Sequence, residues 1–255
     1  MKKRTLFLAG FTSFILTSLT QVPAQLITER LQGKLPFDLQ DVSGTLWQGS
    51  ASSLTWQTTQ LRNLQWAISF PALLKGQLAA DLQAQLATGG KFAGTCGIGF
   101  TRQVQCHALT LNDIPAQSLA PYLQNFMLPE LRGTFQADLE QLTLTQPLPR
   151  ASGKITWQDA GTQLAPQTFG TYTADLSEGG NASQQISLNS APDAAFNASG
   201  QVNLQTDGSY HYTLSFKPDA SVGADVKQFL DAAVGTAQTD GTYHLDKQGK
   251  LNTPN

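Results

Sequence analysis

The sequence is poor in charged residues. Only 13% of its 255 residues are Asp, Glu, Lys or Arg, and the formal net charge is −2, whereas about a quarter of the residues in an average soluble protein are charged. Nucleic-acid binding depends on a dense positive surface, so we expect no nucleic-acid partner. Polarity comes instead from Gln, Thr, Ser and Asn, a composition that favours strands and turns.

Reactive side chains are also scarce and scattered. The three histidines, His107, His211 and His244, fall in separate segments, and none has the spacing typical of a metal site. No GxSxG nucleophile motif is present, and the glycine-rich residues 94–99 lack the Lys-Ser/Thr ending of a phosphate-binding loop. We therefore predict no enzyme activity, no catalytic residue, no metal and no cofactor. A catalytic pair of carboxylates that come together only in the folded chain is the alternative that stays open.

One long uncharged run stands near the N-terminus. Three basic residues at 2–4 precede residues 6–27, which carry no charge and are long enough to cross a membrane as a helix. The basic flank is expected to stay in the cytoplasm. This predicts a cytoplasmic stub (1–5), a transmembrane signal anchor (6–27) and a periplasmic remainder (28–255). Cleavage after the Val-Pro-Ala tripeptide at 22–24 is the alternative, although Pro is a poor match there.

The only two cysteines agree with export. The residues between Cys96 and Cys106 read as a β-hairpin centred near Thr101, in which Ile98, Val104 and both cysteines share one face. Neighbours across two strands come close enough to bond, and a pair of cysteines in an exported chain usually forms a disulfide. We therefore predict a Cys96–Cys106 disulfide. A redox or metal role is the alternative, but no ligand cluster accompanies the pair.

Most of the expected periplasmic part alternates between apolar and polar residues, the period of half-buried strands. Leu78, Leu82 and Leu86 also fit a helical spacing, so that segment is ambiguous. Helix is predicted to continue over 25–34, and two short helices are predicted at 118–127 and 224–234, the last ending before Gly235. Alternating segments begin at Gly44, Gly76, Gly133, Gly153, Gly200 and Gly241.

The predicted fold is thus mainly β. A transmembrane helix is followed by a curved antiparallel sheet or sandwich with two short helices. The turn-rich residues 147–152 are the best candidate for a joint if the sheet consists of two modules.

The most informative motif lies between Pro36 and Gly76. After a positively flanked anchor, the chain reads V-x-G-T-x-W-x-G-x-A from Val42, then L-x-W ending at Trp66, then P-x-x-L-x-G from Pro71. This order resembles the type II secretion system protein N family, and the C-terminal helix, Asp-Gly turn and strand are similar to that family's ending. The candidate structural or partner-surface residues are Gly44, Trp47, Gly49, Trp66, Pro71 and Gly76.

The resemblance implies a function. It implies a non-enzymatic accessory component of type II secretion, anchored by a single pass in the bacterial inner membrane with most of the chain in the periplasm. Such a component acts through contacts with other secretion proteins of the inner membrane and periplasm while folded proteins cross the outer membrane.

A second, architectural likeness implies an alternative function. A long curved sheet behind an inner-membrane anchor also resembles the AsmA and TamB envelope proteins, whose sheets line an apolar groove for lipids. The alternative is a periplasmic lipid-binding or lipid-transfer protein with such a groove. A second protein layer over Trp47, Trp66 and the leucines of 54–86 favours the secretion scaffold, whereas an open trough favours lipid or a hydrophobic partner segment.

Overall fold

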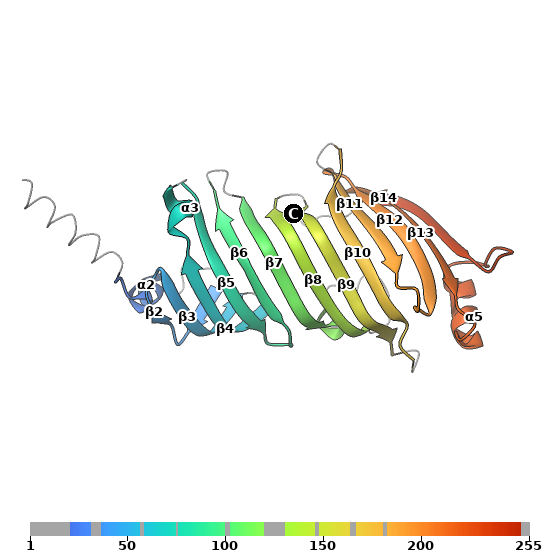
Figure 1. Ribbon diagram of the computed structural model, residues 1–255, viewed down its shortest axis with the longest axis horizontal. Helices are drawn as coiled ribbons and strands as arrows, with labels where there is room; N and C mark the ends of the chain where they lie inside the picture. Colours follow the sequence, from blue (N-terminus) through green and yellow to red (C-terminus); the bar gives the residue numbers. More distant parts are fainter. Residues whose placement is uncertain are drawn as a thin grey trace, which may run out of the picture.

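The computed structural model shows one long, twisted antiparallel sheet (Figure 1). Each strand from β3 to β14 pairs with the next strand along the chain, and β1 pairs with β3 at one edge. The strands are β1 (Phe37–Gln40), β2 (Ser43–Gly44), β3 (Gln48–Trp56), β4 (Thr59–Ile68), β5 (Leu78–Leu86), β6 (Lys91–Ile98), β7 (Val104–Pro115), β8 (Leu131–Leu144), β9 (Arg150–Thr162), β10 (Gly170–Glu178), β11 (Gln184–Ser190), β12 (Phe196–Leu204), β13 (Ser209–Pro218) and β14 (Tyr243–Lys250).

Four short helices accompany the sheet in the described part of the chain. The structure describes residues 21–31, 37–56, 59–74, 76–99, 103–119, 131–145, 148–163, 167–180 and 183–250. Within these ranges the helices are α2 (Ala24–Leu31), α3 (Phe70–Leu74), the 3-10 helix η1 (Ala116–Leu119) and α5 (Ala224–Ala233).

The observed strands and helices can be compared with those predicted from the sequence. The mainly β fold is confirmed, the ambiguous leucine segment is strand β5, and the C-terminal helix is α5, followed by Gly235 with a φ of 106°. Most of the helix predicted at 118–127 lies outside the described residues. Residues 147–152 fall in and after the connection between β8 and β9, which pair along most of their lengths.

One face of the sheet is apolar along its length because apolar residues face each other across successive strands. Leu39, Leu54, Leu61 and Leu86, for example, lie side by side across β1, β3, β4 and β5. No large side chain in the described part of the chain is less than 2% exposed. The expected sandwich is therefore not formed by these residues, because one layer cannot enclose its own apolar face.

β-Bulges keep the apolar residues on this face. Non-glycine residues with φ near +50° stand at register shifts between neighbouring strands. The extra residue changes the spacing of apolar side chains locally from two to three, so that both flanking residues stay on one side. Asn and Asp tolerate this left-handed conformation better than most residues. The bulged residues are Asn63, Ala108, Asp113 and Asp159.

The two ends of the apolar face are covered by helices. At the N-terminal end, α2 places Ala24 in a buried cluster with Val42 and Leu64. At the C-terminal end, the Tyr243 hydroxyl donates a 2.7 Å hydrogen bond to Asp231 of α5, and this bond raises the pKa of Tyr243. In Figure 1, α2 and α5 lie at opposite ends of the sheet.

The last residues of the predicted membrane anchor lie within the described part of the chain. Within the described residues, none of the helices has the length and apolar character needed to cross a membrane, and residues 6–20 lie outside them. Pro23 lacks the backbone N–H that a continuous helix requires, and it forms an isolated β-bridge with Thr45. Ala24 then begins α2 and is only 3% exposed. The boundary at Ile27 stays a prediction, and within the described residues the chain contacts the sheet from Val22 onward.

A buried glutamine bridges strands β9 and β11. Gln184 Oε1 accepts a 2.7 Å hydrogen bond from Ala151 N–H, and its Nε2 donates to the carbonyls of Ala151 and Ser177 at 2.9 and 3.0 Å. The amide thus pairs backbone groups that lie beyond the last ladder pair of β9 and β10.

Replacing Gln184 with leucine is expected to lower the free energy of unfolding by about 2–3 kcal/mol, because it leaves backbone groups without partners. Gln201→Leu, on the exposed side of β12, serves as the matched control with an expected change of less than about 0.5 kcal/mol. Urea unfolding followed by circular dichroism measures both, and equal midpoints would contradict the bridging role.

Candidate functional site: a glycine-tryptophan turn beside an apolar groove

The Gly44–Gly49 segment forms a tight turn between β2 and β3. Gly44 pairs with Gly49 across the turn, and Thr45 N–H donates to Gln48 O at 2.9 Å. Gly44 has a φ of 85°, which favours glycine. A Cβ on Gly49 would lie 2.5 Å from Cζ2 of Trp66 and 2.6 Å from Ser43 O. The two glycines therefore allow an approach that no larger residue permits.

One candidate tryptophan, Trp47, belongs to this turn, and the other, Trp66, packs beside it. Trp66 packs against the buried cluster at the N-terminal end of the sheet, and its Nε1 donates a 3.1 Å hydrogen bond to Leu46 O. Trp47 packs on Phe70 of α3, with ring centroids 5.0 Å apart. The turn thus connects the sheet to α3.

Pro71 and Gly76 delimit α3, a helix that the sequence pattern did not predict. Pro71 stands in the first turn, where its missing N–H costs no hydrogen bond. Gly76 has a φ of 73°, and the N–H groups of Gly76 and Gln77 donate to the carbonyls of Leu73 and Ala72 at 2.9 Å. These two hydrogen bonds together form a Schellman cap. The spacing of Pro71 and Gly76 was a usable cue, but five residues are too few for a periodic pattern.

The same turn holds the residues that follow the uncharged N-terminal run. Leu46 N–H donates to Val22 O at 3.0 Å, Pro23 bridges Thr45, and Gln25 Nε2 donates to Val42 O at 2.8 Å. The point where the N-terminal segment meets the sheet is therefore attached by backbone contacts to the central residues of the motif.

An open groove of about 370 Å³ begins beside this attachment. It runs over the apolar face of β4 to β7, and its lining carries no charged side chain. Leu78, Ile98, Val104 and Leu144 form a row across β5 to β8 at its edge. Leu78 is 53% exposed and Ile98 46%. The lining residues are Leu46, Trp66, Ile68, Leu78, Ala80, Leu82, Cys96, Gly97, Ile98 and Val104.

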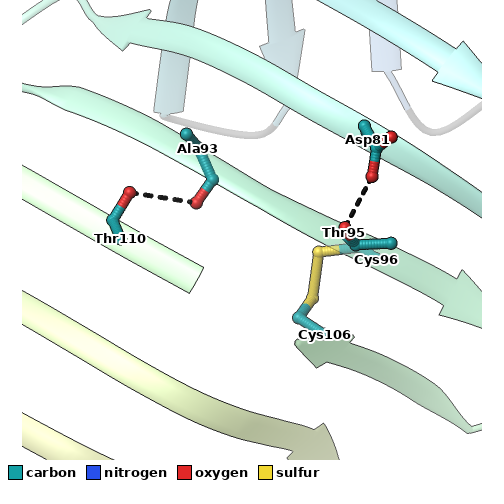
Figure 2. The surroundings of a disulfide bond; sticks show 6 residues. All are labelled: Asp81, Ala93, Thr95, Cys96, Cys106 and Thr110. Atoms are coloured by element: carbon teal, nitrogen blue, oxygen red, sulfur yellow. Dashed lines mark hydrogen bonds between the residues drawn. A yellow bond between two sulfur atoms is a disulfide. The ribbon is translucent and has the colours of Figure 1, made fainter. Parts of the chain in front are cut away.

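The predicted disulfide lies in the floor of this groove. Cys96 in β6 and Cys106 in β7 face each other with Cα atoms 4.0 Å apart and are bonded, as Figure 2 shows. On the opposite face of the sheet, Thr95 Oγ1 donates a 2.5 Å hydrogen bond to Asp81. The disulfide therefore joins β6 and β7 on the apolar side of the sheet.

Two of the three histidines lie on the polar side of β13 and β14, four positions apart along the ladder. His244 Nδ1 lies 2.8 Å from Ser215 Oγ, and His211 Nε2 lies 2.9 Å from Asp246 Oδ1. Both pairs are exposed. Among the described residues, no group of three or more His, Cys, Asp or Glu side chains could hold a metal ion.

The fold and this site define a class of protein: an extended single-layer sheet with an open apolar face and an N-terminal segment attached through a glycine-tryptophan turn. The chain belongs to the family described as Type II secretion system (T2SS), protein N, which it matches over residues 36–246. That match contains the whole turn, α3 and the groove.

Relatives from three bacteria extend this match to nearly the full chain. The chain is 26% identical to the type II secretion system protein N of Vibrio cholerae serotype O1, covering 94% of this chain and 96% of the relative. It is 25% identical to the proteins of that name from Pectobacterium carotovorum subsp. carotovorum and Aeromonas hydrophila, covering 96% of this chain and 92% and 96% of those relatives. No solved structure matches the chain significantly.

Proposed function

We propose that this protein is a non-enzymatic accessory component of type II secretion, anchored in the inner membrane and acting in the periplasm through contacts with other secretion proteins. Family membership over residues 36–246 carries the proposal. The attachment of Val22 and Pro23 to the turn supports an uncleaved N-terminal segment, because these residues form part of the folded sheet.

The length of the proposed anchor is consistent with one membrane pass. Residues 6–22 are 17 uncharged residues behind a basic flank, at the short end of the range of about 17–25 residues that cross a bilayer as a helix. The basic flank supports a periplasmic location of the sheet. A sheet held at the membrane in this way presents its apolar face close to the bilayer and to membrane-bound partners.

Exchange of the anchor tests this function. In a strain that lacks the chromosomal gene, replacing residues 1–22 with a cleavable signal peptide is expected to reduce secretion of a type II substrate at least about tenfold, since a freely diffusing sheet loses the effective concentration given by a shared membrane. Replacing them with an unrelated transmembrane segment of equal length is the matched control and is expected to preserve secretion.

Two results would contradict the proposal. Full secretion with the freely periplasmic form would show that anchoring is dispensable. Release of the natural protein from membranes by alkaline extraction, with a mature N-terminus at Gln25, would show that the segment is cleaved.

A second function is favoured by one observation, the open apolar groove over β4 to β7. The described residues supply no second layer over it, and exposed apolar surface favours a hydrophobic ligand by about 25 cal/mol per Å² covered. The alternative is therefore binding of lipid in this groove, in addition to the role in secretion.

A further inference from the structure

The groove and the attachment of the N-terminal segment share a residue. The side chain of Leu46 lines the groove, while its backbone N–H is bonded to Val22 O. The last residue of the proposed anchor, Val22, is therefore hydrogen-bonded to a residue that lines the groove. A membrane that contained the proposed anchor would lie next to this end of the sheet.

Exposed apolar side chains gather at the same end. Trp47, the residue after Leu46, packs on Phe70 of α3. Leu74 at the end of α3 is 91% exposed, and Phe70 is 50% exposed. With Leu78, which both lines the groove and is exposed, they extend the apolar surface from the groove toward the attachment point.

We propose that this groove holds an acyl chain of a phospholipid from the membrane in which the protein is anchored, with α3 resting against the bilayer. The proposal rests on the anchor and on the lipid-binding function given above, and it names the place, the ligand and its source. The glycine-tryptophan turn then has a defined role, because it fixes the opening of the groove relative to the anchor.

The chemistry of the lining favours a hydrocarbon chain over a peptide. The lining side chains are apolar apart from the indole N–H of Trp66, and that group already donates to Leu46 O. An extended peptide would bring N–H and C=O groups that these side chains cannot pair. A helix pairs its own backbone, and the experiment below separates a helical partner segment from a lipid.

Photocrosslinking in vesicles tests the proposal with the full chain. The protein is reconstituted into vesicles of phosphatidylethanolamine and phosphatidylglycerol that contain a phospholipid with a diazirine on one acyl chain, and labelled peptides are mapped by mass spectrometry. We expect label on residues 78–98 as well as on residues 6–22. Leu78→Glu is expected to reduce the groove label at least about fivefold, because a carboxylate is strongly disfavoured against hydrocarbon.

Phe229→Glu is the matched control. Phe229 lies on α5 at the other end of the sheet and is 53% exposed, as is Leu78, so it introduces the same charge at the same exposure. Its groove label should equal that of the natural protein. Equal melting temperatures of the two variants establish that a loss of label in Leu78→Glu does not come from unfolding.

The possible failures are distinguishable. Label confined to residues 6–22 would overturn the groove proposal and leave the anchor intact. Absence of label from both regions would overturn the anchor as well. Equal labelling of β5 and β11 would show lipid spread over the whole face and would overturn a localised site. An unlabelled groove whose Leu78→Glu variant loses secretion would assign the groove to a partner protein and overturn the lipid.

Discussion

Replacing Gly49 with alanine is expected to lower the free energy of unfolding by about 2–3 kcal/mol, as is typical when atoms are forced into a packed site. The added Cβ would lie 2.5 Å from Cζ2 of Trp66 and 2.6 Å from Ser43 O. Neither neighbour yields easily, because the Trp66 ring is held by its bond to Leu46 O and Ser43 by the pairing of β2 with β3. Urea unfolding followed by circular dichroism measures the change.

Gly180→Ala is the control for this substitution, because no atom lies within 4 Å of a Cβ at that position. Its effect should stay within about 0.5 kcal/mol. Gly49→Ala should also shift the fluorescence of Trp66, measured in a background where the other three tryptophans are phenylalanine. An unchanged unfolding midpoint together with an unchanged spectrum would contradict the tight turn.

Removal of the disulfide is the second large effect. Replacing both Cys96 and Cys106 with alanine is expected to lower the free energy of unfolding by about 2–3 kcal/mol, the value for a closed loop of about ten residues. The sequence separation of the bonded pair is 10. The main cause is the larger conformational entropy of the unfolded chain without the bond, so the folded sheet should stay largely unchanged.

Reduction of the natural protein provides the control, because it breaks the bond without removing the sulfur atoms. Cys106 is buried, so the alanine variant also loses some packing, and the reduced natural protein should be slightly more stable than the variant. Mass spectrometry without a reductant should show the loss of two hydrogens. Free thiols in protein isolated without a reductant, or equal midpoints with and without reductant, would contradict the stabilising bond.

Features that depend on neighbouring residues could be predicted well. The Cys96–Cys106 disulfide could be predicted because a short hairpin places residues at equal distances from its turn opposite each other. Helix α5 could be predicted from the spacing of its apolar residues and from Gly235, which follows it in the sequence. The short helix α3 was missed, although Pro71 and Gly76 were singled out, because one turn of helix has no periodicity to read.

The bulges show where local patterns become ambiguous. Apolar residues spaced by three, such as Leu61 with Leu64 or Leu111 with Ile114, interrupt the period of two. In the sequence this break is compatible with the end of a strand. The structure shows that each strand continues, because Asn63 and Asp113 adopt positive φ and return the next apolar residue to the same face.

The sequence by itself determined that the protein is built of half-buried strands, that its cysteines pair across a hairpin and that its motif is that of the protein N family, since each follows from residues close together in the chain. Only the tertiary structure decided that the described strands form a single layer with helices over the ends of its apolar face alone, that Val22 is hydrogen-bonded to Leu46, and that residues from four strands line one groove. The alternation of apolar and polar residues states that a face is apolar, but what covers that face depends on contacts between residues far apart in the chain.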